Sequence, residues 1–200
     1  MGWTSPIRTR TSFETDPMNM SRRKAITITG AVAILAVALG LFIQTDPFSL
    51  RKGPSADWVF ELSYPDPAGV SRPLKEGRGP FTLVNLWATW CAPCVEEMPE
   101  LSRLHTEVRA SGLSVMGLAV DSPSNVRSFL ASTPVSYPVY VVGGAGSELS
   151  KRLGAQVDAL PFTVIIDSQG RIVRKKLGKL SEDELKMWVK ELKLKALPTK

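Results

Sequence analysis

The chain has 200 residues, 44% of them hydrophobic, and a formal net charge of +6 at pH 7. Its two cysteines and one histidine are too few for a closed structural zinc site, which needs about four ligands. The positive charge does not indicate nucleic-acid binding, because residues 171–200 carry ten Lys and Arg against four Asp and Glu, whereas residues 44–170 carry ten against thirteen. We expect one globular domain with an additional N-terminal segment, and no nucleic-acid partner.

An uncharged apolar run occupies residues 25–43. As a helix it would span roughly 28 Å, close to the hydrocarbon thickness of a bilayer. The basic residues Arg22, Arg23 and Lys24 precede it directly, which predicts a cytoplasmic N-terminus and an exported remainder. The expected division is a basic cytoplasmic segment (1–24), a transmembrane signal anchor (25–43), a tether (44–56), a globular domain (57–195) and a tail (196–200).

Two alternatives to a retained anchor remain open. Residues 36–38 (Ala-Val-Ala) have the small-x-small form of a signal-peptidase site, although the apolar run continues beyond them. Residues 21–23 (Ser-Arg-Arg) are similar to the start of a twin-arginine signal. Met18 or Met20 is an alternative start to Met1.

The first predicted strands follow the tether. Residues 58–62 alternate as a strand does, and the turn-forming residues 65–69 connect them to a short partner at 70–73, which predicts an N-terminal β-hairpin. Residues 81–87 form a nearly continuous apolar run, typical of a central strand that is buried on both faces.

Both cysteines lie in one motif, residues 90–94 (Trp-Cys-Ala-Pro-Cys), directly after this central strand. Two thiols at this spacing can form a disulfide across the first turn of a helix, where free N–H groups favour a thiolate. Cys91 is therefore the candidate nucleophile and Cys94 the resolving thiol. A purely structural disulfide is the alternative, but so short a loop gains little stability from a cross-link. Covalent haem attachment is excluded because Val95, not His, follows the motif.

Glu97 is the third candidate catalytic residue. It lies three residues after Cys94, on the same face of the predicted helix, where it could accept the proton that Cys94 must lose. The alternative is a solvated acid in the first turns of the helix, like Glu96. Met98 is expected in the core, and His105 is expected to be a partly exposed packing or surface residue.

The second half of the chain predicts further strands and helices. A buried strand is expected at 113–120, a helix from 122 to 130, a short strand at 139–142, a flexible turn at 143–146, and a hairpin of strands 162–166 and 172–176. Ser181 and Glu184 form a capping box that begins the last helix. This order predicts an α/β fold with a mixed central sheet and helices on both faces.

Four stretches carry a family resemblance: residues 85–94 (NLWATWCAPC), 97–101 (EMPEL), 160–163 (LPFT) and 165–170 (IIDSQG). They resemble the TlpA/ResA-like membrane-anchored thiol:disulfide oxidoreductases of the thioredoxin superfamily. The likeness covers about residues 57–194. It implies a thioredoxin-like fold at the bacterial inner membrane, facing the periplasm or cell exterior.

The resemblance also implies roles for particular residues. Pro161 would be the cis-proline that packs beside the cysteines. Leu160 would then offer its backbone to an extended substrate segment as an added strand. Trp90, Pro93, Leu160 and Pro161 are the expected substrate-binding residues.

The leading interpretation is a periplasmic reductase that transfers electrons through the Cys91–Cys94 pair to disulfides of exported proteins, in cytochrome c or copper-centre maturation. By resemblance, a DsbD/CcdA-type membrane protein would supply the electrons. We expect a monomer that needs no cofactor besides this redox-active disulfide.

A DsbA-like oxidase is the enzyme alternative, although no His lies between the cysteines. A Cu(I) chaperone using both cysteines and Met98 is another, whereas the sequence around Cys91 does not fit a peroxiredoxin.

Overall fold

The computed structural model of this protein describes residues 55–192. The predicted cytoplasmic segment (1–24), transmembrane anchor (25–43), most of the tether and the tail (196–200) lie outside the described residues. Within residues 55–192, no helix has the length and hydropathy needed to cross a membrane.

A five-stranded mixed sheet forms the centre of the domain, in the strand order β5-β4-β3-β6-β7. The central strand β3 pairs parallel to β4 and antiparallel to β6. The bounds are β3 Phe81–Trp87, β4 Leu113–Ala119, β5 Val139–Val141, β6 Phe162–Asp167 and β7 Ile172–Leu177. β3 is buried from its second residue onward because both faces of the sheet are covered. The predicted central strand, the strands expected at 113–120 and 139–142, the C-terminal hairpin and the mixed character of the sheet are confirmed.

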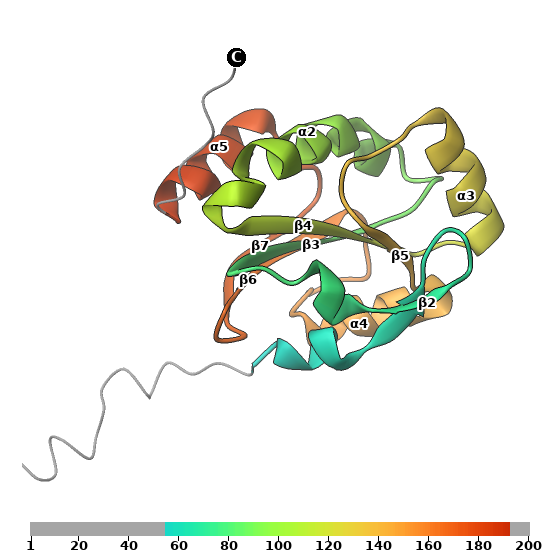
Figure 1. Ribbon diagram of the computed structural model, residues 1–200, viewed down its shortest axis with the longest axis horizontal. Coiled ribbons are helices and arrows are strands. Elements are labelled where there is room, and N and C mark those ends of the chain that lie inside the picture. The colour runs from blue at the N-terminus through green and yellow to red at the C-terminus, as the bar shows by residue number, and fades with distance from the viewer. Residues whose placement is uncertain (1–54, 193–200) are drawn as a thin grey trace, which may run out of the picture. The chain divides into compact units, whose positions relative to one another are not determined.

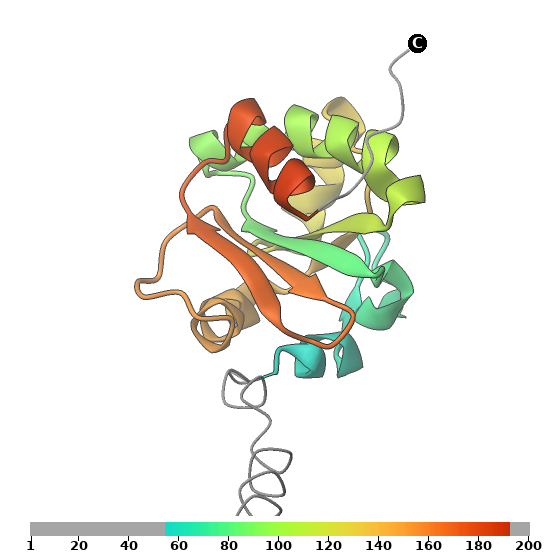
Figure 2. The ribbon, with the colours of Figure 1, turned by 90° about the vertical axis from the view of Figure 1, so that its left-hand side faces the viewer.

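Helices cover both faces of the sheet, as predicted (Figure 1). One face carries α2 (Ala92–Val108), α3 (Pro123–Ser132) and α5 (Glu182–Glu191), whose apolar side chains share one core with Leu83 and Trp87 of β3. The other face carries α4 (Gly146–Arg152) and two 3-10 helices, η2 (Asp57–Glu61) and η3 (Leu74–Gly77), over a second core. Figure 2 shows the twisted sheet between these two layers.

The prediction of a strand over residues 58–62 is wrong, because this segment is the 3-10 helix η2. Val59 and Phe60 are adjacent in sequence, yet both side chains enter the second core. A strand would direct them to opposite faces. The predicted hairpin does exist, but it starts later and forms a separate two-stranded sheet of β1 (Ser63–Pro65) and β2 (Ser71–Pro73).

The predicted flexible turn at 143–146 is a 3-10 helix, η5 (Gly143–Ala145), that leads directly into α4, a helix the sequence analysis missed. A Cβ atom on Gly146 would lie 2.4 Å from Cγ2 of Val120, just after β4. A glycine is therefore needed for the close approach of α4 to this end of the sheet. This approach places the start of α4 near the carboxyl end of β4.

The capping box of α5 is confirmed. The Ser181 hydroxyl accepts a hydrogen bond from the Glu184 N–H, and the Glu184 carboxylate accepts one from the Ser181 N–H. Leu185, Trp188 and Val189 are the buried residues of this helix. The remaining short helix, η4 (Arg109–Ser111), follows α2 and leads to β4.

Candidate active site

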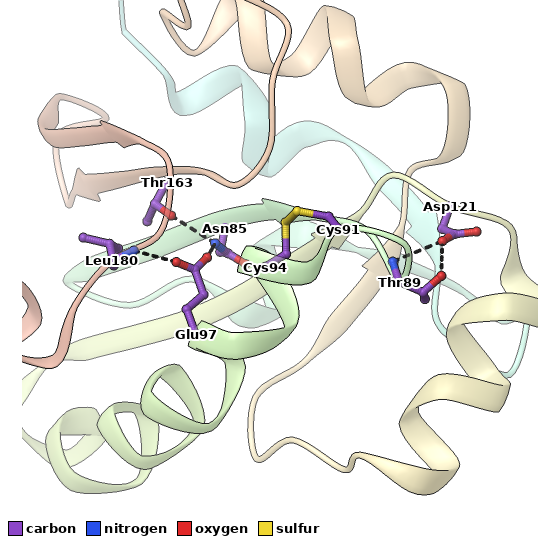
Figure 3. The surroundings of a disulfide bond; sticks show 8 residues. All are labelled: Asn85, Thr89, Cys91, Cys94, Glu97, Asp121, Thr163 and Leu180. Carbon is purple, nitrogen blue, oxygen red and sulfur yellow. Dashed lines mark hydrogen bonds between the residues drawn. A yellow bond between two sulfur atoms is a disulfide. The ribbon is translucent and has the colours of Figure 1, made fainter.

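The two cysteines form a disulfide bond at the start of α2 (Figure 3). Cys91 is the N-cap residue of the helix, and its carbonyl accepts hydrogen bonds from the N–H groups of Cys94 (3.0 Å) and Val95 (3.1 Å). This turn holds the two cysteine Cα atoms 5.3 Å apart. Cys91 is 6% exposed, whereas Cys94 is fully buried. The difference favours Cys91 as the sulfur that reacts with a substrate.

Three residues of the motif beside the disulfide are exposed. Trp90 is 70% exposed, and Ala92 and Pro93 are also exposed. The proline occupies the first turn of α2, where its missing N–H costs no intrahelical hydrogen bond. The helix N-terminus beside Cys91 favours the negative charge of a thiolate once the disulfide is reduced.

Glu97 lies beneath the disulfide, one turn into α2, and its side chain is fully buried. Its carboxylate accepts two hydrogen bonds of 2.7 Å each, one from Nδ2 of Asn85 on β3 and one from the N–H of Leu180 before α5 (Figure 3). Asn85 also donates to Oγ1 of Thr163 on β6, at 3.0 Å. The alternative of a solvated acid at position 97 is therefore wrong.

Burial raises the pKa of Glu97 to about 7, because removing the carboxylate from water disfavours its charged form. The hydrogen bonds from Leu180 and Asn85, and the positive charges of Lys179 and Lys176, lower the pKa by less. Glu97 can therefore both hold and release a proton near neutral pH. The neighbouring Glu96 is exposed and forms an ion pair with Lys179 at 2.7 Å.

The Leu160–Pro161 peptide bond is cis, which confirms that prediction. The Pro161 carbonyl accepts a hydrogen bond from the N–H of Gly178 at 2.8 Å. In contrast, neither the N–H nor the C=O of Leu160 has a hydrogen-bond partner among residues 55–192. Leu160 thus has free backbone groups on the same side of the domain as the disulfide.

A groove of about 580 Å³ runs beside the disulfide. It is lined by the motif residues Trp90 to Pro93, by Val120, by Gly144 and the start of α4, and by residues 158–160. Cys91 and Leu160 both line it, so the two residues border a common space.

The structure places the remaining candidates in the core. Met98 is fully buried among the apolar residues of α2, as expected. The expectation of a partly exposed His105 is wrong, because its side chain is only 5% exposed. Its Nδ1 accepts a hydrogen bond from the N–H of Val115 on β4 at 3.2 Å, which gives a buried imidazole a structural partner.

Sequence reasoning missed the contact that fixes the loop before the cysteines. The carboxylate of Asp121 accepts hydrogen bonds from the hydroxyl (2.5 Å) and N–H (3.2 Å) of Thr89. Burial raises the pKa of Asp121, but hydrogen bonds from Thr89 and Asn125 outweigh it and hold the pKa below its usual value. One signal was available: Thr89 and Asp121 follow β3 and β4, whose carboxyl ends meet at one edge of the sheet because the strands are parallel.

No group of three or more His, Cys, Asp or Glu side chains within the described part of the chain could hold a metal ion.

Comparison with known proteins matches residues 60–190 to the family described as Redoxin. The thiol-disulfide oxidoreductase ResA of Halalkalibacterium halodurans is 26% identical over 167 residues, which are 82% of this chain and 93% of the relative. A thioredoxin-related protein of Neisseria meningitidis serogroup B is 37% identical, with a TM-score of 0.54, over 60% of this chain and 90% of the other. A thiol:disulfide interchange protein of Chlorobium tepidum, 23% identical, has a TM-score of 0.57 over 65% of this chain and 91% of the other, and so shows a shared fold.

Proposed function

Because this chain belongs to the redoxin family and is a TlpA/ResA-like thiol:disulfide oxidoreductase of the thioredoxin superfamily, we propose that it reduces disulfides of exported proteins. The observation that carries this proposal is the arrangement of Cys91 and Cys94 above the buried Glu97 at the start of α2. It provides a nucleophile, a resolving thiol and a proton acceptor within the first two turns of the helix.

Reduction proceeds by two exchange steps. In the reduced protein, the Cys91 thiolate attacks one sulfur of a substrate disulfide, so that a Cys91–substrate bond forms, the substrate S–S bond breaks and one substrate thiolate leaves. The Cys94 thiol then loses its proton and attacks the sulfur of Cys91, which releases the second substrate thiolate. The protein is left with the Cys91–Cys94 disulfide seen in the structure, and two electrons have passed to the substrate.

Glu97 serves the second step. Cys94 is fully buried, so its proton has no direct route to solvent water. Glu97 lies three residues along the same helix, and its pKa of about 7 lets it accept a proton at physiological pH. The carboxylate held by Asn85 and Leu180 is thus a local base for the resolving thiol.

A substrate segment would bind in extended form beside the disulfide. The unpaired N–H and C=O of Leu160 can form strand-like hydrogen bonds with it. Trp90, at 70% exposure, together with Pro93, offers apolar contact next to the reactive sulfur. Pro161 holds Leu160 in place through the hydrogen bond from Gly178.

The proposed location is the bacterial inner membrane, with the catalytic domain in the periplasm or outside the cell. It is supported by the apolar run at 25–43 and the basic residues just before it. A reductase outside the cytoplasm needs electrons from inside, and a DsbD/CcdA-type membrane protein is the proposed donor. Proteins of cytochrome c or copper-centre assembly are the proposed substrates, and the working form is a monomer.

The direction of electron flow is tested by the reduction potential. No cationic residue lies between the cysteines, so we expect only moderate stabilisation of the thiolate and a potential near ~−270 mV, in contrast to the ~−120 mV of a strong periplasmic oxidant. The gap corresponds to roughly 7 kcal/mol for two electrons. Equilibration of the protein with glutathione buffers, read by thiol alkylation, measures it directly. A potential above about −180 mV would assign the protein as a DsbA-like oxidase instead.

A further inference from the structure

Of the described residues that line the groove beside the disulfide, one carries a charged side chain. Its other lining residues are aromatic, aliphatic, glycine, serine or cysteine, and the exception is Asp158, two residues before Leu160. We propose that Asp158 is a specificity-determining residue, which favours substrates with a Lys or Arg side chain close to the reacting cysteine. This inference rests on the proposed function, because it concerns the substrate of the same disulfide exchange.

The two serine hydroxyls of the groove already donate hydrogen bonds within the protein, so neither is free to donate one to a ligand. The Ser147 hydroxyl donates to Oδ2 of Asp158 at 2.6 Å, and the Ser150 hydroxyl donates to the Ser147 carbonyl at 2.9 Å. Oδ1 of Asp158 has no donor among residues 55–192. The carboxylate is therefore held in position by Ser147 while one oxygen stays free for a ligand.

No basic side chain within the described ranges neutralises Asp158. Lys151 lies one turn beyond Ser147 on α4 but forms no ion pair with Asp158. Arg152 instead lies over the ring of Trp58, 3.6 Å from its centroid. Lys175 donates to the carbonyl of Gly154 at 3.2 Å. An exposed carboxylate without an internal cation complements a cationic group on a partner.

The position of Asp158 relative to the chemistry identifies the part of the substrate it would meet. Cys91 and Asp158 line the same groove. A substrate strand paired with Leu160 would lie along this groove, so a residue close to the reacting cysteine can meet the carboxylate. A glutamate there would be repelled, and a lysine or arginine would be attracted.

Three peptides test this proposal. They share one sequence with a single cysteine, held as a mixed disulfide with thionitrobenzoate, and differ only in Lys, Gln or Glu next to that cysteine. The reduced full chain, purified in detergent, attacks the peptide sulfur and releases coloured thionitrobenzoate, which stopped-flow absorbance records. Each rate is divided by that of 2-mercaptoethanol, because a nearby charge also alters the peptide's intrinsic reactivity towards any thiolate.

At low ionic strength we expect the normalised rate for the Lys peptide to exceed that for the Glu peptide by about fivefold, the scale of an exposed ion pair. Asp158→Asn should reduce this ratio by about the same factor, and Asp158→Lys should favour the Glu peptide. Asn keeps an oxygen that can accept from Ser147, so it removes the charge without removing the contact with α4. Asp183→Asn, the same change on the exposed surface of α5, should leave the ratio unaltered.

Other outcomes separate the alternatives. If Asp158→Asn slows all three peptides equally, the residue only holds its loop against α4 and the specificity proposal is wrong. Equal rates for Lys and Glu peptides in the unaltered protein would also overturn it, while leaving the exchange chemistry intact. Absence of thionitrobenzoate release from every peptide would instead contradict the proposed function itself.

Discussion

Replacement of Cys94 by Ala should trap the protein in mixed disulfides through Cys91. The first exchange step needs only the Cys91 thiolate, whereas the second needs the buried thiol that the substitution removes. Turnover of a protein disulfide should therefore fall to the uncatalysed rate, while adducts accumulate. Non-reducing electrophoresis of cells that express the full chain, followed by mass spectrometry of the adducts, measures both effects.

Cys91→Ser is the matched control for this experiment, because it removes the attacking sulfur and leaves Cys94 in place. It should abolish turnover and adducts together. The captured proteins should be exported ones, and a set of exclusively cytoplasmic partners would contradict the proposed location. If Cys94→Ala gives no adduct that depends on Cys91, the two-step mechanism is wrong.

Glu97→Gln should slow the resolving step on the order of 10²-fold, the usual contribution of a positioned base. In the unaltered protein this step should accelerate as pH rises through about 7, where Glu97 loses its proton. The variant should lack that dependence. Decay of a preformed Cys91 mixed disulfide, followed from pH 5 to 9, isolates the step. The glutamine amide fits the site once the side-chain amide of Asn85 flips. Asn85 Oδ1 is buried without a hydrogen-bond partner among residues 55–192, and after the flip it can accept from the new NH₂ group.

Glu96→Gln is the control, since Glu96 is exposed and paired with Lys179. It makes the same chemical change one residue away and should alter neither the rate nor its pH dependence. Small, equal effects from both substitutions would return Glu97 to a structural role.

The same substitution at position 97 should change the stability of the oxidised protein in a pH-dependent way. Burial raises the pKa of Glu97 to about 7 in the folded protein, whereas in the unfolded chain its pKa is the ordinary 4.5. The folded state therefore loses stability as pH rises from about 4.5 to about 7, and the loss persists above that range; the shift corresponds to on the order of 3 kcal/mol. Urea unfolding should find Glu97→Gln more stable than the unaltered protein at pH 8, with the difference vanishing near pH 4.5.

Local patterns in the sequence were enough to predict the redox motif and much of the framework around it. The apolar run of β3, the position of Pro93 in the first turn of α2 and the capping box at Ser181 each depend on neighbours within a few residues, and the structure confirms them. The resemblance to TlpA/ResA-like proteins added the cis bond before Pro161, which no local pattern indicates.

The chemistry of Glu97 was decided by contacts between distant parts of the chain. Its two partners are Asn85, twelve residues earlier, and Leu180, 83 residues later. The local spacing placed Glu97 on the same helix face as Cys94. It could not show whether that face was exposed to water or packed against β3 and the start of α5. Burial by those elements raises the pKa of the Glu97 carboxyl group. Glu96, one residue earlier, is exposed and is not buried by them.

Tertiary packing also determined the structure of residues 57–61, where the local pattern predicted a strand. Residues 58–62 have the apolar alternation of a strand, yet the side chains of Val59 and Phe60 both pack in the second core. Burial of both side chains stabilises a 3-10 helix at this position. The sequence by itself thus determined which sulfur chemistry the protein can carry out, because two thiols at the start of a helix are a local arrangement. Only the tertiary structure decided the proton affinity of Glu97, because the burial that raises its pKa and the hydrogen bond from Leu180 come from elements far away in the chain.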